Sequence, residues 1–168
     1  MTLVVPTSAD MERLGRAWGS VLHAGDVVVL TGELGAGKTT LSRGIGEALG
    51  VETPVSSPTF IVARTHQRTE SSEPPLVHLD AYRVGSLAEL DELDIDVAGS
   101  IVLAEWAAPF ASALSPSWVE VTVERPVGDA DSFDEDEPRT VTLAHHGVSS
   151  DLMDRLTGAS EEFRVSRG

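Results

Sequence analysis

One stretch of the sequence, Gly32-Glu33-Leu34-Gly35-Ala36-Gly37-Lys38-Thr39-Thr40, fits the P-loop pattern G-x-x-x-x-G-K-[ST] without a mismatch. The apolar, β-branched residues 27–31 precede it and predict a buried strand. Residues 41–49 follow it and predict a helix that ends at Gly50. A strand, a glycine-rich loop and a helix in this order are the context that a P-loop requires, so the stretch predicts a phosphate-binding site.

The residue types of the loop predict how phosphate would be held. Glycines let the backbone approach a phosphate closely and turn its N–H groups toward it, at the positive end of the helix dipole. Lys38 is expected to place its charge beside the β- and γ-phosphates, and the Thr39 hydroxyl is expected to bind Mg²⁺. The nucleotide-binding residues predicted from the loop are Gly32, Glu33, Leu34, Gly35, Ala36, Gly37, Lys38, Thr39 and Thr40.

Composition narrows the class of protein. A chain of 168 residues is expected to form one domain, and the absence of cysteine excludes disulfides and thiolate zinc sites. No apolar run approaches membrane-spanning length, and no basic region precedes the apolar residues at the N-terminus, so a cytoplasmic protein with no membrane association is expected. The formal net charge of −15 argues against a protein that grips nucleic acid by itself.

Two acidic residues stand at the ends of predicted strands. Residues 76–79, apolar except for His78, lead into Asp80, and apolar residues 101–104 lead into Glu105. Ligands of open α/β sheets bind outside the carboxyl ends of the strands, so either acid could hold Mg²⁺ or orient an attacking water. The alternative for each is a solvated carboxylate at a strand end. We interpret His78, inside the first of these strands, as a packed core residue.

The remaining patterns complete the predicted fold. Helical spacing predicts an amphipathic helix over residues 8–23, with Ser8 as its N-cap. Residues 60–64 are predicted to pair with 76–79 as a hairpin, and residues 118–124 with 140–143 around a solvated acidic loop at 129–137. The fold class is therefore α/β: a single P-loop NTPase-like domain over residues 1–146, with a mixed, mostly parallel sheet flanked by helices and an antiparallel hairpin. Residues 147–168 are expected to form a partly disordered tail with one short helix.

The irregular segment at 51–60 contains two prolines and follows the predicted nucleotide-binding helix. P-loop GTPases carry a switch segment at this place, ordered by the γ-phosphate. Thr59 is therefore a candidate for a second hydroxyl near Mg²⁺. The alternative is a plain surface loop.

Four pieces of the sequence together resemble the TsaE (YjeE) family of bacterial P-loop ATPases, in order as well as in spacing. They are the P-loop, Ser57-Pro58-Thr59-Phe60, His78-Leu79-Asp80-Ala81-Tyr82-Arg83 and Glu105-Trp106. The resemblance covers roughly residues 5–125. It implies a protein that binds and hydrolyses ATP with Mg²⁺ and assists the synthesis of N6-threonylcarbamoyladenosine (t6A) in tRNA. Homologues of TsaB and TsaD would be its partners and would stimulate a weak ATPase, and tRNA would be reached only through that complex.

The resemblance also implies roles for single residues. Lys38 would hold phosphates, and Thr39 would bind Mg²⁺. Glu105 would be the Walker-B-like acid and Asp80 would support hydrolysis, and which of the two carboxylates touches the metal stays open. Trp106 would stand beside the nucleotide site or a partner surface. Thr59 would belong to the switch-like loop.

Two other classes of P-loop protein are the alternatives. Small-molecule kinases usually bring an arginine-rich lid over the phosphates, and the basic residues Arg64, Arg68 and Arg83 form no such cluster in the sequence. GTPases normally recognise guanine with an N-K-x-D loop, and the chain contains no asparagine.

Overall fold

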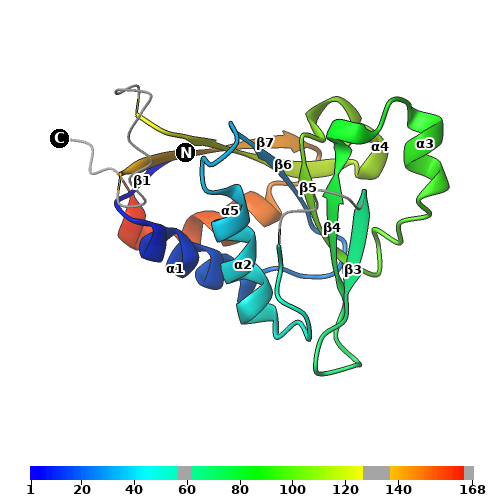
Figure 1. Ribbon diagram of the computed structural model, residues 1–168, viewed down its shortest axis with the longest axis horizontal. Coiled ribbons are helices and arrows are strands. Elements are labelled where there is room, and N and C mark those ends of the chain that lie inside the picture. Colours follow the sequence, from blue (N-terminus) through cyan, green and yellow to red (C-terminus); the bar gives the residue numbers. More distant parts are fainter. Residues whose placement is uncertain (57–61, 127–136, 165–168) are drawn as a thin grey trace.

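The computed structural model describes residues 1–56, 62–126 and 137–164. These residues form one mixed sheet in the order β1-β7-β6-β2-β5-β4-β3 (Figure 1). The four central strands β6, β2, β5 and β4 are parallel, and antiparallel pairing adds β7 and β1 at one edge and β3 at the other. The predicted α/β class, with its mixed sheet and antiparallel hairpins, is confirmed. The strand bounds are β1 Thr2–Val5, β2 Val27–Thr31, β3 Ala63–His66, β4 Leu76–Asp80, β5 Ile101–Glu105, β6 Ser117–Glu124 and β7 Arg139–Gly147.

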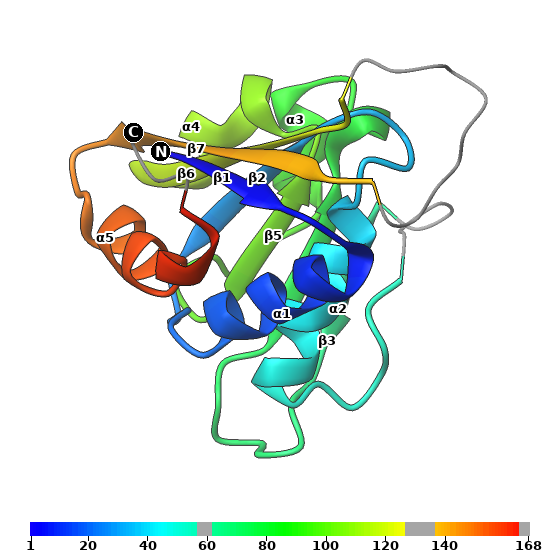
Figure 2. The ribbon, with the colours of Figure 1, turned by 90° about the vertical axis from the view of Figure 1, so that its left-hand side faces the viewer.

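Helices cover both faces of this sheet (Figure 2). On one face lie α1 (Ser8–Gly19), α2 (Lys38–Leu49) and α5 (Asp151–Gly158), with the 3₁₀ helix η3 (Glu161–Phe163) after them. On the other face lie α3 (Leu87–Glu92) and α4 (Ala111–Leu114). The 3₁₀ helix η1 (Ala81–Arg83) follows β4 directly, and η2 (Ala108–Phe110) follows β5 after Trp106 and Ala107. Because β2 is buried on both faces, its first four residues are apolar without alternation.

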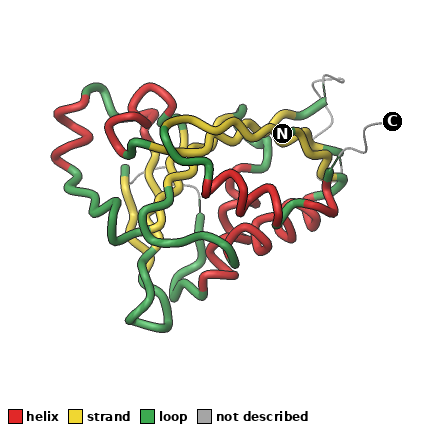
Figure 3. The backbone as a smooth tube through the Cα atoms, turned by 180° about the vertical axis from the view of Figure 1, so that it is seen from behind, coloured by secondary structure: helices red, strands yellow, loops and turns green. Residues whose placement is uncertain are grey.

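Helices α1 and α2 pack backbone against backbone, side by side in Figure 3. A Cβ atom added to Gly15 would lie 2.3 Å from the carbonyl oxygen of Leu41, and one added to Gly44 would lie 2.3 Å from that of Glu12. Only glycine permits this approach. Because α2 begins at the lysine of the P-loop, the packing also fixes the position of the loop.

Some element boundaries differ from those predicted. Helix α1 ends at Gly19 rather than residue 23, because Leu22 reaches the core from the following turn and so extends the apolar spacing. Its N-cap is Thr7 rather than Ser8, with the Thr7 hydroxyl accepting the Asp10 N–H at 3.1 Å. Strand β3 begins at Ala63 rather than residue 60, and residues 57–61 lie outside the described residues. Strand β1 had no counterpart in the prediction.

Residues 151–164 of the expected tail pack against the sheet. Leu152, Leu156 and Phe163 are buried in the same core as α1 and α2. The indole Nε1 of Trp18 donates a buried hydrogen bond to the Ser160 hydroxyl at 2.8 Å. Most of the predicted acidic loop lies outside the described residues. No helix among the described residues is long and apolar enough to cross a membrane.

Candidate functional site

The P-loop connects β2 to α2, as the sequence predicts. Gly32 lies so close to β6 that an added Cβ would meet the Val123 carbonyl oxygen at 2.4 Å. Gly37 is the N-cap of α2, and its φ of 117° is a backbone conformation that residues with a side chain rarely adopt. No side chain of the described residues caps this helix end. The first N–H groups of α2 are therefore left to a ligand, and the helix dipole favours an anionic one.

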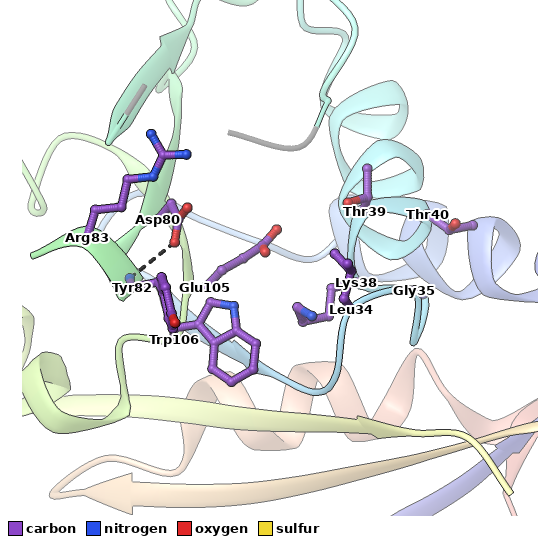
Figure 4. A pocket seen from close by; sticks show the side chains of 11 residues that line it. Leu34, Gly35, Lys38, Thr39, Thr40, Asp80, Tyr82, Arg83, Glu105 and Trp106 are labelled. Carbon is purple, nitrogen blue, oxygen red and sulfur yellow. Dashed lines mark hydrogen bonds between the residues drawn. The ribbon is translucent and has the colours of Figure 1, made fainter. Parts of the chain in front are cut away.

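A pocket of about 680 Å³ opens beside the loop (Figure 4). This is a usual volume for a small-molecule or cofactor site, about 300–1,000 Å³. The P-loop and the start of α2 form one wall, and the ends of β4 and β5 with η1 form the wall opposite. Its lining residues are Leu34, Gly35, Gly37, Lys38, Thr39, Thr40, Asp80, Tyr82, Arg83, Glu105 and Trp106.

Lys38 is held over the loop by backbone carbonyls. Its Nζ donates to the carbonyl oxygens of Gly32 at 2.6 Å and Glu33 at 3.0 Å, and it lies 5.1 Å from the centre of the Trp106 ring. Burial lowers the pKa of Lys38, and the negative charges of Glu105 and Asp80 act in the opposite direction. The Lys38 ammonium is suited to bind an anion that enters the pocket, because the two hydrogen bonds that hold it go to neutral carbonyl oxygens.

The two acidic residues lie side by side on the wall of the pocket opposite α2, as expected for residues at the ends of adjacent parallel strands. Asp80 and Glu105 are register partners at the ends of the adjacent parallel strands β4 and β5. Glu105 is buried, and its Oε1 lies 3.0 Å from Nε2 of His78. Asp80 is half-buried, and its Oδ1 accepts the N–H of Tyr82 at 3.1 Å, which caps η1. Figure 4 shows both carboxylates facing the side of the pocket that carries Thr39 and Lys38.

Trp106 turns the chain at the end of β5. Its φ of 58° lies in the left-handed region, which is costly for a bulky residue, and its N–H donates to the Leu30 carbonyl oxygen at 3.1 Å. The ring meets Tyr82 edge to face, with 6.0 Å between centroids. Tyr82 is 76% exposed and Leu34 is 96% exposed, so the pocket carries apolar side chains at its mouth.

A second, smaller hollow of about 160 Å³ lies on the other side of the loop. Arg139 of β7 reaches under the loop there and donates from Nε to the Ala36 carbonyl oxygen at 3.2 Å. Gly35, Gly37 and Thr40 line both hollows. The remaining lining residues of the smaller hollow are Thr7, Ser8, Met11, Ala36 and Arg139.

The structure brings most of the predicted site residues together. The pocket contains Lys38, Thr39, Thr40, Asp80, Glu105 and Trp106, with the loop residues Leu34, Gly35 and Gly37. Gly32 and Glu33 contribute the carbonyls that hold Lys38, and Ala36 faces the smaller hollow. Thr59 lies outside the described residues. Among those residues no group of three or more His, Cys, Asp or Glu could hold a metal ion alone, so a cation here would also need hydroxyl or phosphate oxygens.

Three residues of this region were not assigned to the site from the sequence. Tyr82 and Arg83 line the pocket, and His78 contacts Glu105 from beneath it. The signal for Tyr82 and Arg83 was their position directly after a strand-end acid, where the chain must still border the pocket. The interpretation of His78 as a buried strand residue is correct as to burial, but it missed the bond to Glu105.

Comparisons with known proteins agree on one family. Residues 5–131 match the family model described as threonylcarbamoyl adenosine biosynthesis protein TsaE. A Streptomyces coelicolor protein named tRNA threonylcarbamoyladenosine biosynthesis protein TsaE is 46% identical over 140 residues, which span 82% of this chain and 91% of that protein. A Mycobacterium tuberculosis protein of the same name is 43% identical over 132 residues, 74% of this chain and 79% of that protein. The fold resembles the crystal structure of Bacillus subtilis YdiB with a TM-score of 0.71 at 23% identity, covering 98% and 96% of the two chains.

Proposed function

This chain belongs to the TsaE family, and we propose that it binds and hydrolyses ATP with Mg²⁺ in support of tRNA threonylcarbamoyladenosine biosynthesis. One observation carries the catalytic part of the proposal. A complete P-loop with its lysine and the carboxylates of Asp80 and Glu105, from distant parts of the sequence, border one pocket of suitable size. This combination provides for phosphate binding, for a metal ion and for activation of water.

The nucleotide would lie with its phosphates over the N-terminus of α2. A γ-phosphate oxygen would accept from Lys38 Nζ, in a charge-assisted hydrogen bond stronger than those to the Gly32 and Glu33 carbonyls. Because Thr40 and the loop glycines border both hollows, the nucleoside end would extend toward the smaller one. Its polar lining, with Thr7, Ser8 and Arg139, offers partners for a base or a ribose.

The oxygen donors of the pocket suit Mg²⁺. Thr39 supplies a hydroxyl from the first turn of α2, and Glu105 and Asp80 supply carboxylates from the opposite wall. Bound there, Mg²⁺ would neutralise negative charge that develops on the phosphates during hydrolysis. One carboxylate would bind the ion or its water, and the other would orient the attacking water.

Homologues of TsaB and TsaD are the proposed partners, in the cytoplasm, with tRNA reached only through them. The net charge of −15 supports an indirect route to tRNA, because direct binding would require cationic contacts with phosphates. The exposed Leu34 and Tyr82 at the pocket mouth offer apolar contact to a partner protein. Such a partner would stimulate hydrolysis.

A small-molecule kinase is the second candidate, because Arg83 lines the pocket. An arginine facing transferred phosphate is a feature of phosphoryl transfer to an acceptor as well as to water. The pocket would then have to admit a metabolite beside ATP. The two proposals differ in the fate of the γ-phosphate.

The test is phosphate release by the parent and by Asp80→Ala and Glu105→Ala, alone and with a TsaB–TsaD pair. Each variant should bind ATP but lose hydrolysis by about 10²-fold or more, because the lost carboxylate acts mainly in the transition state. Glu124→Ala is the matched control, since Glu124 is an exposed acid at the end of parallel strand β6 and does not line the pocket. If the partners leave the hydrolysis rate unchanged and the protein transfers phosphate efficiently to a metabolite, the ATPase proposal is wrong and the kinase proposal is supported.

A further inference from the structure

The carboxylate of Glu105 is held from the core side by a histidine that does not reach the pocket. We infer that His78 is a positioning residue for ATP hydrolysis, which fixes the orientation of Glu105 through a buried hydrogen bond. The inference rests on the proposed ATPase function and assigns a role that the P-loop and the acid pair do not include.

The geometry of the pair is specific. Nε2 of His78 lies 3.0 Å from Oε1 of Glu105, and the exposed fractions of the two residues are 1% and 6%. They project from the adjacent parallel strands β4 and β5, toward the face that carries α2. Val77 and Leu79, the neighbours of His78 in β4, belong to the core on the opposite face. His78 is therefore directed beneath the site by the strand itself.

The bond determines which oxygen of Glu105 faces the pocket. An ionised carboxylate only accepts hydrogen bonds, so His78 donates from Nε2 and occupies Oε1. The second oxygen, Oε2, remains for a metal ion or water in the pocket. Without the bond, the Glu105 side chain would regain rotamer freedom, and its buried charge would lose a donor. Groups bonded to metal ligands and catalytic carboxylates typically change activity by about 10- to 100-fold when removed.

The effect should fall on turnover rather than on ATP binding. His78 does not line the pocket, and the P-loop backbone and Lys38 keep their places without it. Most contacts to the phosphates of bound ATP therefore stay, while an oriented Glu105 oxygen is lost from the transition state. This split between kcat and KM separates a positioning role from general damage to the fold.

A neighbouring histidine provides a matched control. His66 of β3 is also 1% exposed, but its Nδ1 bonds the hydroxyl of Thr53 at 2.8 Å. His66→Leu therefore makes the same chemical change as His78→Leu in the same sheet. It removes a charge neighbour of His78, but the hydrogen bond between His78 and Glu105 stays. It should keep kcat within about twofold of the parent, as substitutions outside the site do when folding is retained.

The experiment compares four variants by kcat, KM for ATP and thermal unfolding. His78→Leu should lower kcat by about 10- to 100-fold and leave KM within about threefold of the parent. His78→Gln should restore most of the rate, because its amide nitrogen takes the place of Nε2. His78→Asn, equally polar but too short, should not. If the leucine variant fails to fold, the glutamine and asparagine pair carries the test alone.

Equal rates for the glutamine and asparagine variants would overturn the inference, as would a folded His78→Leu variant with parental kcat. A His66→Leu variant that loses as much kcat as His78→Leu would also overturn it, because the effect would then be general. A parent that hydrolyses no ATP, alone or with its partners, would remove the proposed function and this inference with it. An active parent with unaffected His78 variants would remove this inference alone.

Discussion

Replacing Gly44 by alanine should separate the two helices that position the P-loop. A Cβ at residue 44 would lie 2.3 Å from the carbonyl oxygen of Glu12, and ordinary van der Waals contact begins at 3.4 Å. The opposing atom belongs to the backbone of α1, so no side-chain rotation can relieve the clash. Helix α2 must shift as a unit, and the P-loop at its N-terminus must shift with it.

The magnitude follows from two opposing terms. Overpacking of a core costs about 1–3 kcal/mol, and a clash between two backbones belongs near the upper value. Alanine in a helix interior returns about 0.5–1 kcal/mol relative to glycine. The free energy of unfolding should therefore fall by about 2 kcal/mol, which in a domain of this size lowers Tm by about 4–8 °C.

Urea unfolding followed by tryptophan fluorescence and by circular dichroism would measure this change. Gly158→Ala is the control, because nothing lies within 4 Å of a Cβ added at that position near the end of α5. It should raise the free energy of unfolding by about 0.5 kcal/mol or leave it unchanged. The reasoning is refuted if Gly44→Ala unfolds at the parental urea concentration, or if both substitutions destabilise equally.

Three further predictions concern single side chains. Lys38→Ala should leave Tm nearly unchanged but weaken ATP binding or hydrolysis by about 10²–10³-fold. Isothermal titration would measure the binding and a phosphate-release assay the hydrolysis, and parental values in both would show that the site assignment is wrong. Burial is the main cause that lowers the pKa of His66, so as the pH falls the unfolded chain takes up this proton before the folded protein does, and stability falls below about pH 6.5. Between pH 7.5 and pH 5.5 the Tm of His66→Leu should therefore fall less than the Tm of the parent. An equal fall in the two proteins would contradict this. Trp18→Phe should cost about 2 kcal/mol through the bond to Ser160 and the smaller ring, and a double-mutant cycle with Ser160→Ala would show no coupling if that bond is irrelevant.

Local sequence patterns were sufficient to predict the elements whose residues are dictated by one simple physical requirement. The P-loop needs glycine where the backbone takes positive φ, and the apolar runs at β2, β4 and β5 follow from burial on both faces of a parallel sheet. Asp80 and Glu105 were predictable as strand-end residues, because parallel strands end at the same edge of a sheet.

Patterns failed where tertiary contacts decide the structure. Residues 2–5 were given no element, because a short edge strand depends on distant partners, and β1 finds these in β7 and in a bridge from Leu3 to Arg164. The buried packing of Leu152 and Phe163 depends on the open face of the sheet beside α1, which no local signal shows. The end of helix α1 was predicted too late because Leu22, which lies beyond the helix, is buried and fits helical spacing as well as a residue within it.

The pair of His78 and Glu105 combines both situations. Burial of His78 follows from its place in an apolar strand. Its partner, Glu105, lies 27 residues further along the chain and is brought to it by the register of β4 against β5. In that register Leu103 stands opposite His78 and Glu105 stands opposite Asp80, so the imidazole reaches diagonally to the next residue on the same face. A shift of either strand by one residue would turn the acid or the histidine to the other face of the sheet. The parallel pairing of these two strands therefore sets the acid pair in the pocket and supplies, from the core beneath it, the donor that holds Glu105 in place.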